Sequence, residues 1–309
     1  MLKRVMCITG CFFLCLAKVD AQGLVDKIDT IDKTVAEKVD NTMTAITTDK
    51  PSTYEKNHKK QRKLAENPYG IAFYRPTYIL PFYYTQRPDY TAYQHNTPDN
   101  QVVQRQEFKY QLSFMVPVVT DVFDHPDTDV DVAYTQVSYW QVYAKSQYFR
   151  ETNYEPELFL SLHPKINWFI HTGVDHQSNG RGGEFERSWN RAYADLIFTR
   201  DNWYFSVKPW VLIFPSESSN LHNPDIRHYM GNGQFRAAYK IGENELSVMS
   251  RNNLQSAFHR GAEEIDYSHA LYKNFNVYVQ LFSGYGQSLI EYNHYTNSVG
   301  VGIAFNNWL

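Results

Sequence analysis

From about residue 70 onward, apolar and polar side chains alternate along the chain in short runs. Phe108, Tyr110 and Leu112, for example, are interleaved with Lys109 and Gln111. Because successive side chains of a β-strand point to opposite faces, this period of two predicts strands with one apolar and one polar face. About twelve such segments follow one another, near residues 72–84, 107–119, 130–144, 154–163, 166–178, 187–200, 203–214, 227–240, 244–253, 260–271, 274–285 and 294–309.

An even number of segments of this length is typical of a transmembrane β-barrel. A closed antiparallel sheet gives every backbone amide a partner and leaves no edge in hydrocarbon. An apolar exterior around a polar interior explains how 24 Tyr, 19 Phe and 6 Trp coexist with a mean hydropathy of -0.52. We therefore expect an all-β, twelve-stranded antiparallel transmembrane barrel over residues 67–309. A soluble β-sandwich is the alternative, but it explains the aromatic segment ends poorly.

Other classes of protein are excluded by simple arguments. Past the N-terminus no run of about eighteen apolar residues occurs, so the chain is not a helical membrane protein. A formal charge of -3 gives no electrostatic reason to expect nucleic acid as a partner.

The first 66 residues differ in composition from the rest. Two basic residues precede an apolar run from Val5 to Leu16, and a small-x-small cleavage site ends at Ala21. Residues 1–21 are therefore predicted to be a secretory signal peptide. All three cysteines lie within this segment, so the folded protein uses neither disulfides nor a thiolate metal site.

Residues 22–66 are interpreted as a helical or flexible periplasmic extension. Apolar residues spaced by three and four between Ile28 and Ile46 predict an amphipathic helix or a short coiled-coil seam. Pro51 and Ser52 are expected to end it. The basic run that follows could be a partner-binding arm, but charge runs are usually solvated, which favours a partly ordered linker.

Three polar residues fall on the lipid-facing parity of two neighbouring strands. His176 and Ser178 continue the alternation of Val174, and Asn190 shares parity with Ala192. Polar groups at a lipid surface are costly, so their convergence suggests a function. His176 can serve as general base for the Ser178 hydroxyl, and Asn190 can orient the imidazole. The alternative is a pair of surface polar residues, because His-x-Ser by itself is a weak signal.

An amide in the orienting position stabilises an imidazolium less well than a carboxylate does. An additional cation near the developing oxyanion would offset that loss.

The segment His176-Gln-Ser-Asn-Gly-Arg181, followed by Arg187-Ser-Trp-Asn-Arg191, resembles the signature of outer membrane phospholipase A, the calcium-dependent phospholipase family of Gram-negative bacteria. The resemblance covers roughly residues 67–309 and leaves out the extension. It also includes Ala133–Gln136, Phe149–Pro156, Val207–Trp210, Asn223–Ile226, Tyr229–Gly231 and Ser283–Gly286.

The resemblance implies an outer-membrane barrel that hydrolyses acyl esters of membrane phospholipids, needs Ca²⁺ and is activated as a homodimer. Phospholipase A1, A2 and lysophospholipase activities are all implied as possible. By position, Ser178 is similar to the nucleophile, His176 to the base and Asn190 to the orienting residue. The amide of Gly180 resembles the oxyanion donor, and the carbonyl of Arg181 a calcium ligand.

Two further residues are implied at the dimer interface. Ser146 occupies the place of a serine that completes the partner's calcium site, although its loop is shorter than the family pattern. Gln136 follows the lipid-facing parity, where an amide is best satisfied by its mate in a second subunit. Alternatively, the Gln136 amide reaches toward the membrane surface or bonds to a residue of a neighbouring strand in the same subunit.

A non-catalytic outer-membrane channel or structural barrel that keeps the motif by descent is the competing hypothesis. Inward residues such as Lys109, Gln111 and Lys208 could line a pore. They are bulky, however, and side chains can fill a barrel of this strand number.

Glu186 departs from the family pattern, which has a serine ligand just before Arg187. A carboxylate is a hard oxygen ligand that suits calcium, so Glu186 could bind the ion directly. Alternatively it pairs with Arg181 or Arg187.

The substitution Glu186→Gln distinguishes these two roles. If Glu186 is a ligand, the variant should need more calcium for half-maximal activity, because a neutral amide binds the ion less strongly. A calcium titration of lipid hydrolysis measures this, and an unchanged curve would remove Glu186 from the ligand set.

Overall fold

The computed structural model describes residues 50–309 apart from 66, 68–69, 123–126, 215–220 and 273. The predicted signal peptide, residues 1–21, and the helix predicted between Ile28 and Ile46 lie outside the described residues.

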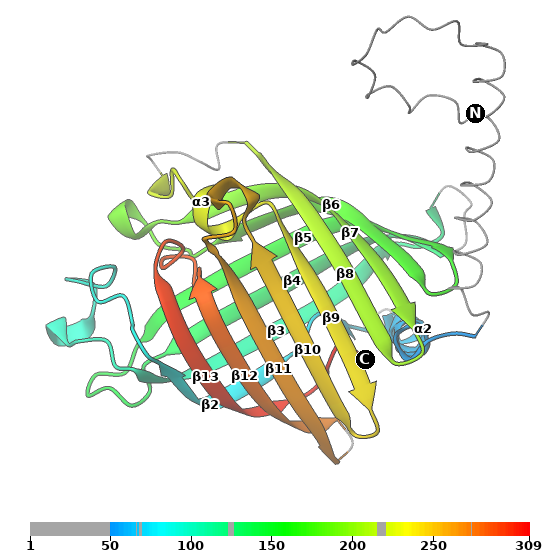
Figure 1. The fold of residues 1–309 in the computed structure, drawn as a ribbon, viewed down its shortest axis with the longest axis horizontal. Helices are drawn as coiled ribbons and strands as arrows, with labels where there is room; N and C mark the ends of the chain where they lie inside the picture. The colour runs from blue at the N-terminus through cyan, green and yellow to red at the C-terminus, as the bar shows by residue number, and fades with distance from the viewer. Residues whose placement is uncertain (1–49, 66, 68–69, 123–126, 215–220, 273) are drawn as a thin grey trace, which may run out of the picture. The chain divides into compact units, whose positions relative to one another are not determined.

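Within the described residues, thirteen strands belong to one antiparallel sheet (Figure 1). They are β1 (Ala72–Phe73), β2 (Tyr78–Thr85), β3 (Gln106–Val119), β4 (Thr128–Trp140), β5 (Phe149–Lys165), β6 (Trp168–Ser178), β7 (Ser188–Arg200), β8 (Trp203–Ile213), β9 (Gly233–Ile241), β10 (Asn244–Asn252), β11 (Gly261–Tyr272), β12 (Phe275–Tyr285) and β13 (Tyr295–Ala304). Within the same residues, two α-helices accompany them, α2 (Thr53–Ala65) and α3 (Arg227–Met230), with short 3-10 helices at Pro98–Asn100, Gly183–Phe185 and Leu254–Ser256.

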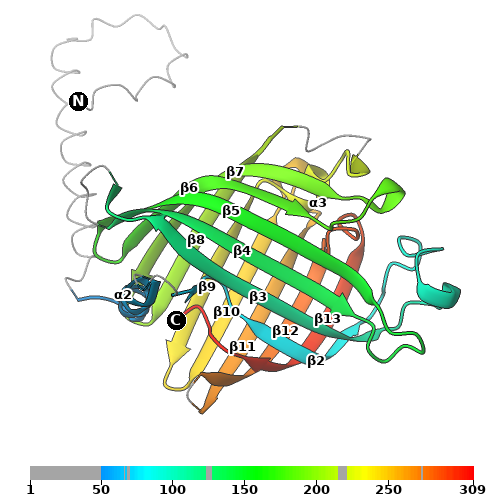
Figure 2. The ribbon, with the colours of Figure 1, turned by 180° about the vertical axis from the view of Figure 1, so that it is seen from behind.

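The sheet closes on itself, as both views show (Figures 1 and 2). Each strand from β2 to β13 pairs with its sequence neighbours, and β13 pairs back to β2. The short β1 adds only a two-residue pairing along β3. The predicted twelve-stranded antiparallel barrel is therefore confirmed, and no barrel strand is left with an open edge.

Burial follows the alternation that the sequence predicts. On β8, Val207 is 50% exposed, whereas its neighbour Lys208 is 5% exposed. The same holds on β3, where Leu112 and Phe114 face outward and Lys109 is buried. The apolar face therefore covers the outside of the barrel, as a lipid-facing surface requires.

The two ends of the barrel carry different connections. At the end where α2 lies, β5 and β6 are joined by residues 166–167, and β7 and β8 by residues 201–202. At the end where α3 lies, the connections are longer, such as residues 179–187 between β6 and β7 and 214–232 between β8 and β9. Outer-membrane barrels have short periplasmic turns and long extracellular loops, so α2 marks the periplasmic end.

Paired charged side chains cross the lumen. Six charged residues on inner faces form what we call the lumen network, and each cation contacts at least one carboxylate; they are Arg75, Glu155, Glu157, Asp175, Arg191 and Lys208. The three carboxylates lie within 4.8 Å of one another, a spacing that would suit a metal, but the three cations already balance them. Paired charges of this kind are the condition for burying them. The predicted inward orientation of bulky residues is therefore confirmed.

The basic run is not the solvated linker that we expected. It forms α2, and Ser52 caps the start of this helix, because the Ser52 hydroxyl accepts a hydrogen bond from the amide of Glu55 at 3.1 Å. Tyr54 and His58, four residues apart on one helix face, pack on Phe169 with ring centroids 5.1 and 4.9 Å away.

The opposite face of α2 agrees with the prediction, since its lysines are exposed: Lys56, Lys59, Lys60 and Lys63. No helix in the described part of the chain combines the length and apolarity needed to cross a membrane.

Several predicted strand segments differ from the observed strands at their ends, among them 227–240 and 294–309. Residues 227–230 form α3, and β9 begins only at Gly233. The last strand ends at Ala304, after which Trp308 and Leu309 donate their backbone amides to the buried carboxylate of Glu245 at 2.9 and 3.1 Å. The alternation of apolar and polar residues in the sequence could not show that the residues after Ala304 leave the barrel sheet.

The docking of α2 should depend on pH. Burial, together with the nearby His171, His163 and Arg62, lowers the pKa of His58 to about 4, and Glu55 opposes this shift. An undocked His58 would titrate near 6.5, so undocking takes up a proton between about pH 6.5 and pH 4. Docking should therefore be strongest above this window and weaken as the pH falls through it.

Hydrogen exchange of the α2 amides, corrected for intrinsic rates, measures this effect. Protection should fall between pH 7 and pH 5 in the natural chain. In His58→Phe, which keeps a ring against Phe169 but cannot titrate, it should fall less. Equal pH dependence in the two proteins would contradict the role of His58.

Candidate active site

The register of β6 and β7 places His176 directly opposite Asn190. Nδ1 of His176 lies 2.8 Å from Oδ1 of Asn190, and His176 is exposed on the outer face. An amide oxygen can only accept, so this contact places the imidazole proton on Nδ1 and leaves Nε2 as a proton acceptor. The predicted base and its predicted orienting residue are therefore in direct contact.

Ser178 is two residues along the same strand and lies on the same outer face. It is half-buried, pairs in register with Ser188 on β7 and with Tyr154 on β5, and makes no side-chain hydrogen bond to another described residue. Catalytic hydrogen bonds are often long before substrate binds, so a hydroxyl two residues from the imidazole on the same strand face is compatible with nucleophilic chemistry.

The inner face of the same strands holds this pair in place. On the inner face, Arg191 Nε donates to Asp175 Oδ1 at 2.7 Å, and Trp189 Nε1 donates to Gln177 Oε1 at 2.7 Å. Glu155 on β5 accepts from Arg191 at 2.9 Å and from Gln177 at 3.4 Å. One carboxylate thereby ties three strands together behind the site, a role that sequence reasoning missed.

Residues 179–187, which we call the site loop, follow Ser178. Gly180 has φ +64, a left-handed conformation, and a Cβ at this position would lie 2.9 Å from Cε2 of Tyr154. Both the torsion and the space require glycine. The predicted oxyanion donor is therefore the amide of a residue, Gly180, whose backbone conformation is unfavourable for any other amino acid.

The side chains of Arg181 and Arg187 bond to groups other than the carboxylate of Glu186. Arg181 donates to Glu151 at 3.0 Å and also to the carbonyl of Arg150, and Arg187 donates to the carbonyls of Glu184 and Glu186. Within the described residues, neither arginine pairs with the carboxylate of Glu186. The ion-pair alternative for Glu186 is therefore not what this structure adopts.

The two predicted interface residues have partners within the chain. The hydroxyl of Ser146, in the loop between β4 and β5, donates to Asp99 Oδ2 at 2.6 Å. The amide of Gln136 donates to Tyr110 at 3.2 Å and accepts from Tyr134 at 3.0 Å. A second subunit is thus not needed to satisfy Gln136, as the alternative for this residue anticipated.

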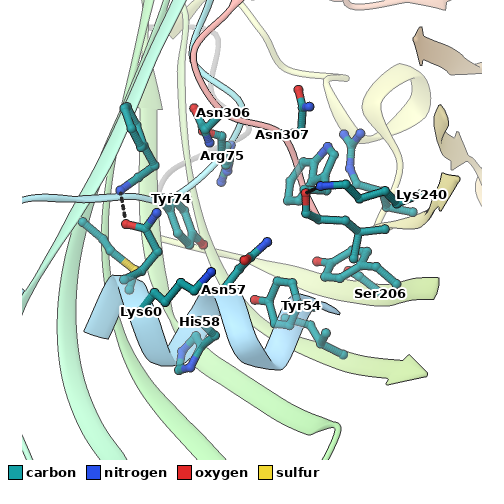
Figure 3. A pocket seen from close by; sticks show the side chains of 18 of the residues that line it. Tyr54, Asn57, His58, Lys60, Tyr74, Arg75, Ser206, Lys240, Asn306 and Asn307 are labelled. Atoms are coloured by element: carbon teal, nitrogen blue, oxygen red, sulfur yellow. Dashed lines mark hydrogen bonds between the residues drawn. The ribbon is translucent and has the colours of Figure 1, made fainter. Parts of the chain in front are cut away.

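A cavity of about 400 Å³ lies at the periplasmic end, between α2, the inner face of the barrel and the chain's last residues (Figure 3). Its walls include Tyr54, His58 and Lys60 from α2, and Ser206 and Lys240 from the barrel. None of the predicted catalytic residues lines it. The residues predicted to be catalytic lie instead at the opposite end, on the outer face.

Comparison with known proteins gives consistent results. The sequence profile of the phospholipase A1 family matches residues 54–305. The chain is 36% identical over 251 residues to phospholipase A1 of Salmonella typhimurium, which covers 78% of this chain and 83% of that relative.

Two solved structures are similar to the fold. One is the Salmonella typhi outer membrane phospholipase dimer with bound calcium, with a TM-score of 0.74, 34% identity, and coverage of 81% of this chain and 98% of that one. The other is outer membrane phospholipase A of Escherichia coli with an active-site asparagine replaced by alanine. Its TM-score is 0.71, its identity is 33%, and the match covers 79% of this chain and 95% of that one.

Replacing Gly180 should damage the site without unfolding the barrel. In Gly180→Ala, the left-handed torsion costs about 1–2 kcal/mol and the methyl group meets Tyr154, so the loop should shift. We expect slower labelling of Ser178 by a fluorophosphonate probe. Gly182→Ala is the matched control variant, because the φ of Gly182 is -116° and no atom lies within 4 Å of an added Cβ. Equal labelling rates in both variants would contradict a role for Gly180.

Proposed function

The chain belongs to the phospholipase A1 family, and we propose that it is an outer-membrane, calcium-dependent phospholipase that hydrolyses acyl esters of membrane phospholipids. The observation that carries this proposal is the contact between His176 and Asn190 beside Ser178, on the face of the barrel that meets lipid. The active-site asparagine named for the Escherichia coli structure supports the assignment of Asn190.

In the proposed mechanism, a phospholipid in the outer leaflet brings its ester to Ser178. Nε2 of His176 takes the hydroxyl proton while Oγ of Ser178 forms a bond to the acyl carbon. Asn190 accepts the hydrogen bond from Nδ1 and keeps Nε2 aimed at the serine. His176 then gives the proton to the departing alcohol, and water, activated by the same imidazole, releases the fatty acid from Ser178.

The amide of Gly180 is the proposed donor to the oxyanion that forms on the acyl carbonyl. Two oxygen groups of the site loop fit a calcium ion, because neither the carbonyl of Arg181 nor the carboxylate of Glu186 has a hydrogen-bond partner among the described residues. Hard oxygen donors of these types are the usual calcium ligands. A bound calcium would add positive charge near the oxyanion, which offsets the weaker support of an amide for the imidazolium.

A homodimer is part of the proposal, since the similar Salmonella typhi protein was solved as a dimer with calcium. Ser146 lies at the same end of the barrel as the site loop and is the candidate ligand supplied to the partner. Gln136, on the outer face of β4, is the candidate interface amide. To reach a mate it would exchange its contacts with Tyr110 and Tyr134.

The competing channel hypothesis has less support. The lumen network crosses the interior, and α2 and the chain's last residues cover the periplasmic end around the cavity. Ions would have to pass between paired, buried charges.

Substitution of the nucleophile tests the proposed function. Ser178→Ala should lower calcium-dependent fatty acid release from phospholipid in mixed micelles at least about a thousandfold, because the covalent step is lost. Asn190→Ala should cost less, about tenfold, which is the value of one hydrogen bond to the imidazole. Release that persists in Ser178→Ala, or conductance without hydrolysis in the natural chain, would overturn the proposal.

A further inference from the structure

Asn179 is the most buried residue of the site loop, with 4% of its surface exposed. The residues around it are open to solvent, since Gly182, Gly183 and Glu184 are all exposed. A buried amide must satisfy its hydrogen-bonding groups within the protein. The Asn179 side chain must therefore find its hydrogen-bond partners inside the protein.

The side chain of Asn179 bonds across the loop at three places. Its Oδ1 accepts from the amides of Arg187 at 3.0 Å and Arg181 at 3.3 Å, and its Nδ2 donates to the carbonyl of Phe185 at 2.8 Å. Its own backbone amide donates to the carbonyl of Arg187 at 3.1 Å, which extends the β6–β7 ladder by one residue. One residue thus joins the beginning, the middle and the end of the loop.

We propose that Asn179 is a positioning residue that holds the site loop in its calcium-binding shape before the ion arrives. This inference rests on the proposed function, in which Arg181 and Glu186 supply calcium ligands from this loop. Both groups flank atoms that Asn179 fixes: the amide of Arg181 is bonded directly, and Glu186 stands between Phe185 and Arg187.

The physical reason is the cost of ordering a loop on binding. A loop with two adjacent glycines loses much backbone freedom when it is fixed, and a ligand that must supply that ordering binds less tightly. With Asn179 in place, the site loop is already ordered in the folded protein, so calcium binding does not have to order it. Loss of groups that orient metal ligands typically weakens metal affinity by about ten- to a hundredfold.

A second contact attaches the site loop to the barrel. The guanidinium of Arg181 donates to Glu151 at 3.0 Å, and Glu151, which is 1% exposed, also accepts from Asn153 and from the amide of Ile290. This pair attaches the loop to β5 but does not join its two ends. Glu151→Gln should therefore affect calcium binding less than the loss of Asn179 does.

The geometry also explains why an amide is required at position 179. A carboxylate could accept from Arg181 and Arg187, but it could not donate to the carbonyl of Phe185 and would repel it. Asn179→Asp is therefore a near-isosteric variant that breaks one bond of the three. Asn179→Ala removes all three.

The test measures calcium binding without turnover, in the Ser178→Ala background, by calorimetric titration with calcium chloride. We expect the calcium concentration for half-saturation to rise about tenfold or more in Asn179→Ala. Asn179→Asp should show a smaller rise. Asn244→Asp, at the periplasmic end, changes the same chemical group away from the loop and should leave binding unchanged.

Hydrogen exchange in the absence of calcium is the second measurement. The amides of Arg181 and Arg187 should lose protection in Asn179→Ala, which removes their acceptor, and should lose much less in Asn179→Asp, while the barrel strands keep theirs. This readout separates a local change from general unfolding.

The outcomes distinguish the two proposals. Wild-type calcium affinity in Asn179→Ala, or no calcium binding by the parent protein, would overturn the role of Asn179. The proposed function fails separately, if the natural chain releases no fatty acid or if Ser178→Ala remains active.

Discussion

The backbone ladder that closes between β13 and β2 is the constraint on which the rest of this structure depends. In hydrocarbon an unpaired amide is too costly, so the sheet must close and its strands must keep their pairing over their whole length. Regular pairing forces side chains to alternate between lipid and lumen. The position of the candidate site follows from this alternation, because His176 and Ser178 continue the parity of Val174, which is 43% exposed.

The lumen network is the counterpart of that outer face. Its ion pairs cross the space that the closed sheet encloses, and one of them, between Asp175 and Arg191, lies directly behind the contact between His176 and Asn190. A slip of one residue between β6 and β7 would break this buried pair and turn every side chain of one strand to the other face. The geometry of an outer-face site is therefore maintained from the inside of the barrel.

The prediction of strands and parity from the sequence was accurate because both arise from local periodicity. Prediction failed where a segment is stabilised by distant residues. The basic run became α2 because Tyr54 and His58 find Phe169, more than a hundred positions away in the chain. The final residues left the wall because Glu245 accepts their amides. Neither Glu245 nor Phe169 shows any local signal of such a contact.

The sequence by itself determined the barrel, the outward parity of His176, Ser178 and Asn190, and the family resemblance around them, since a period of two and a short motif are both local properties. Only the tertiary structure decided that Asn190 meets Nδ1 of the imidazole, that neither neighbouring arginine pairs with the carboxylate of Glu186, and that Asn179 closes the site loop. These contacts depend on strand register and on the path of a loop, which are set by the packing of the whole barrel and not by spacing along the chain.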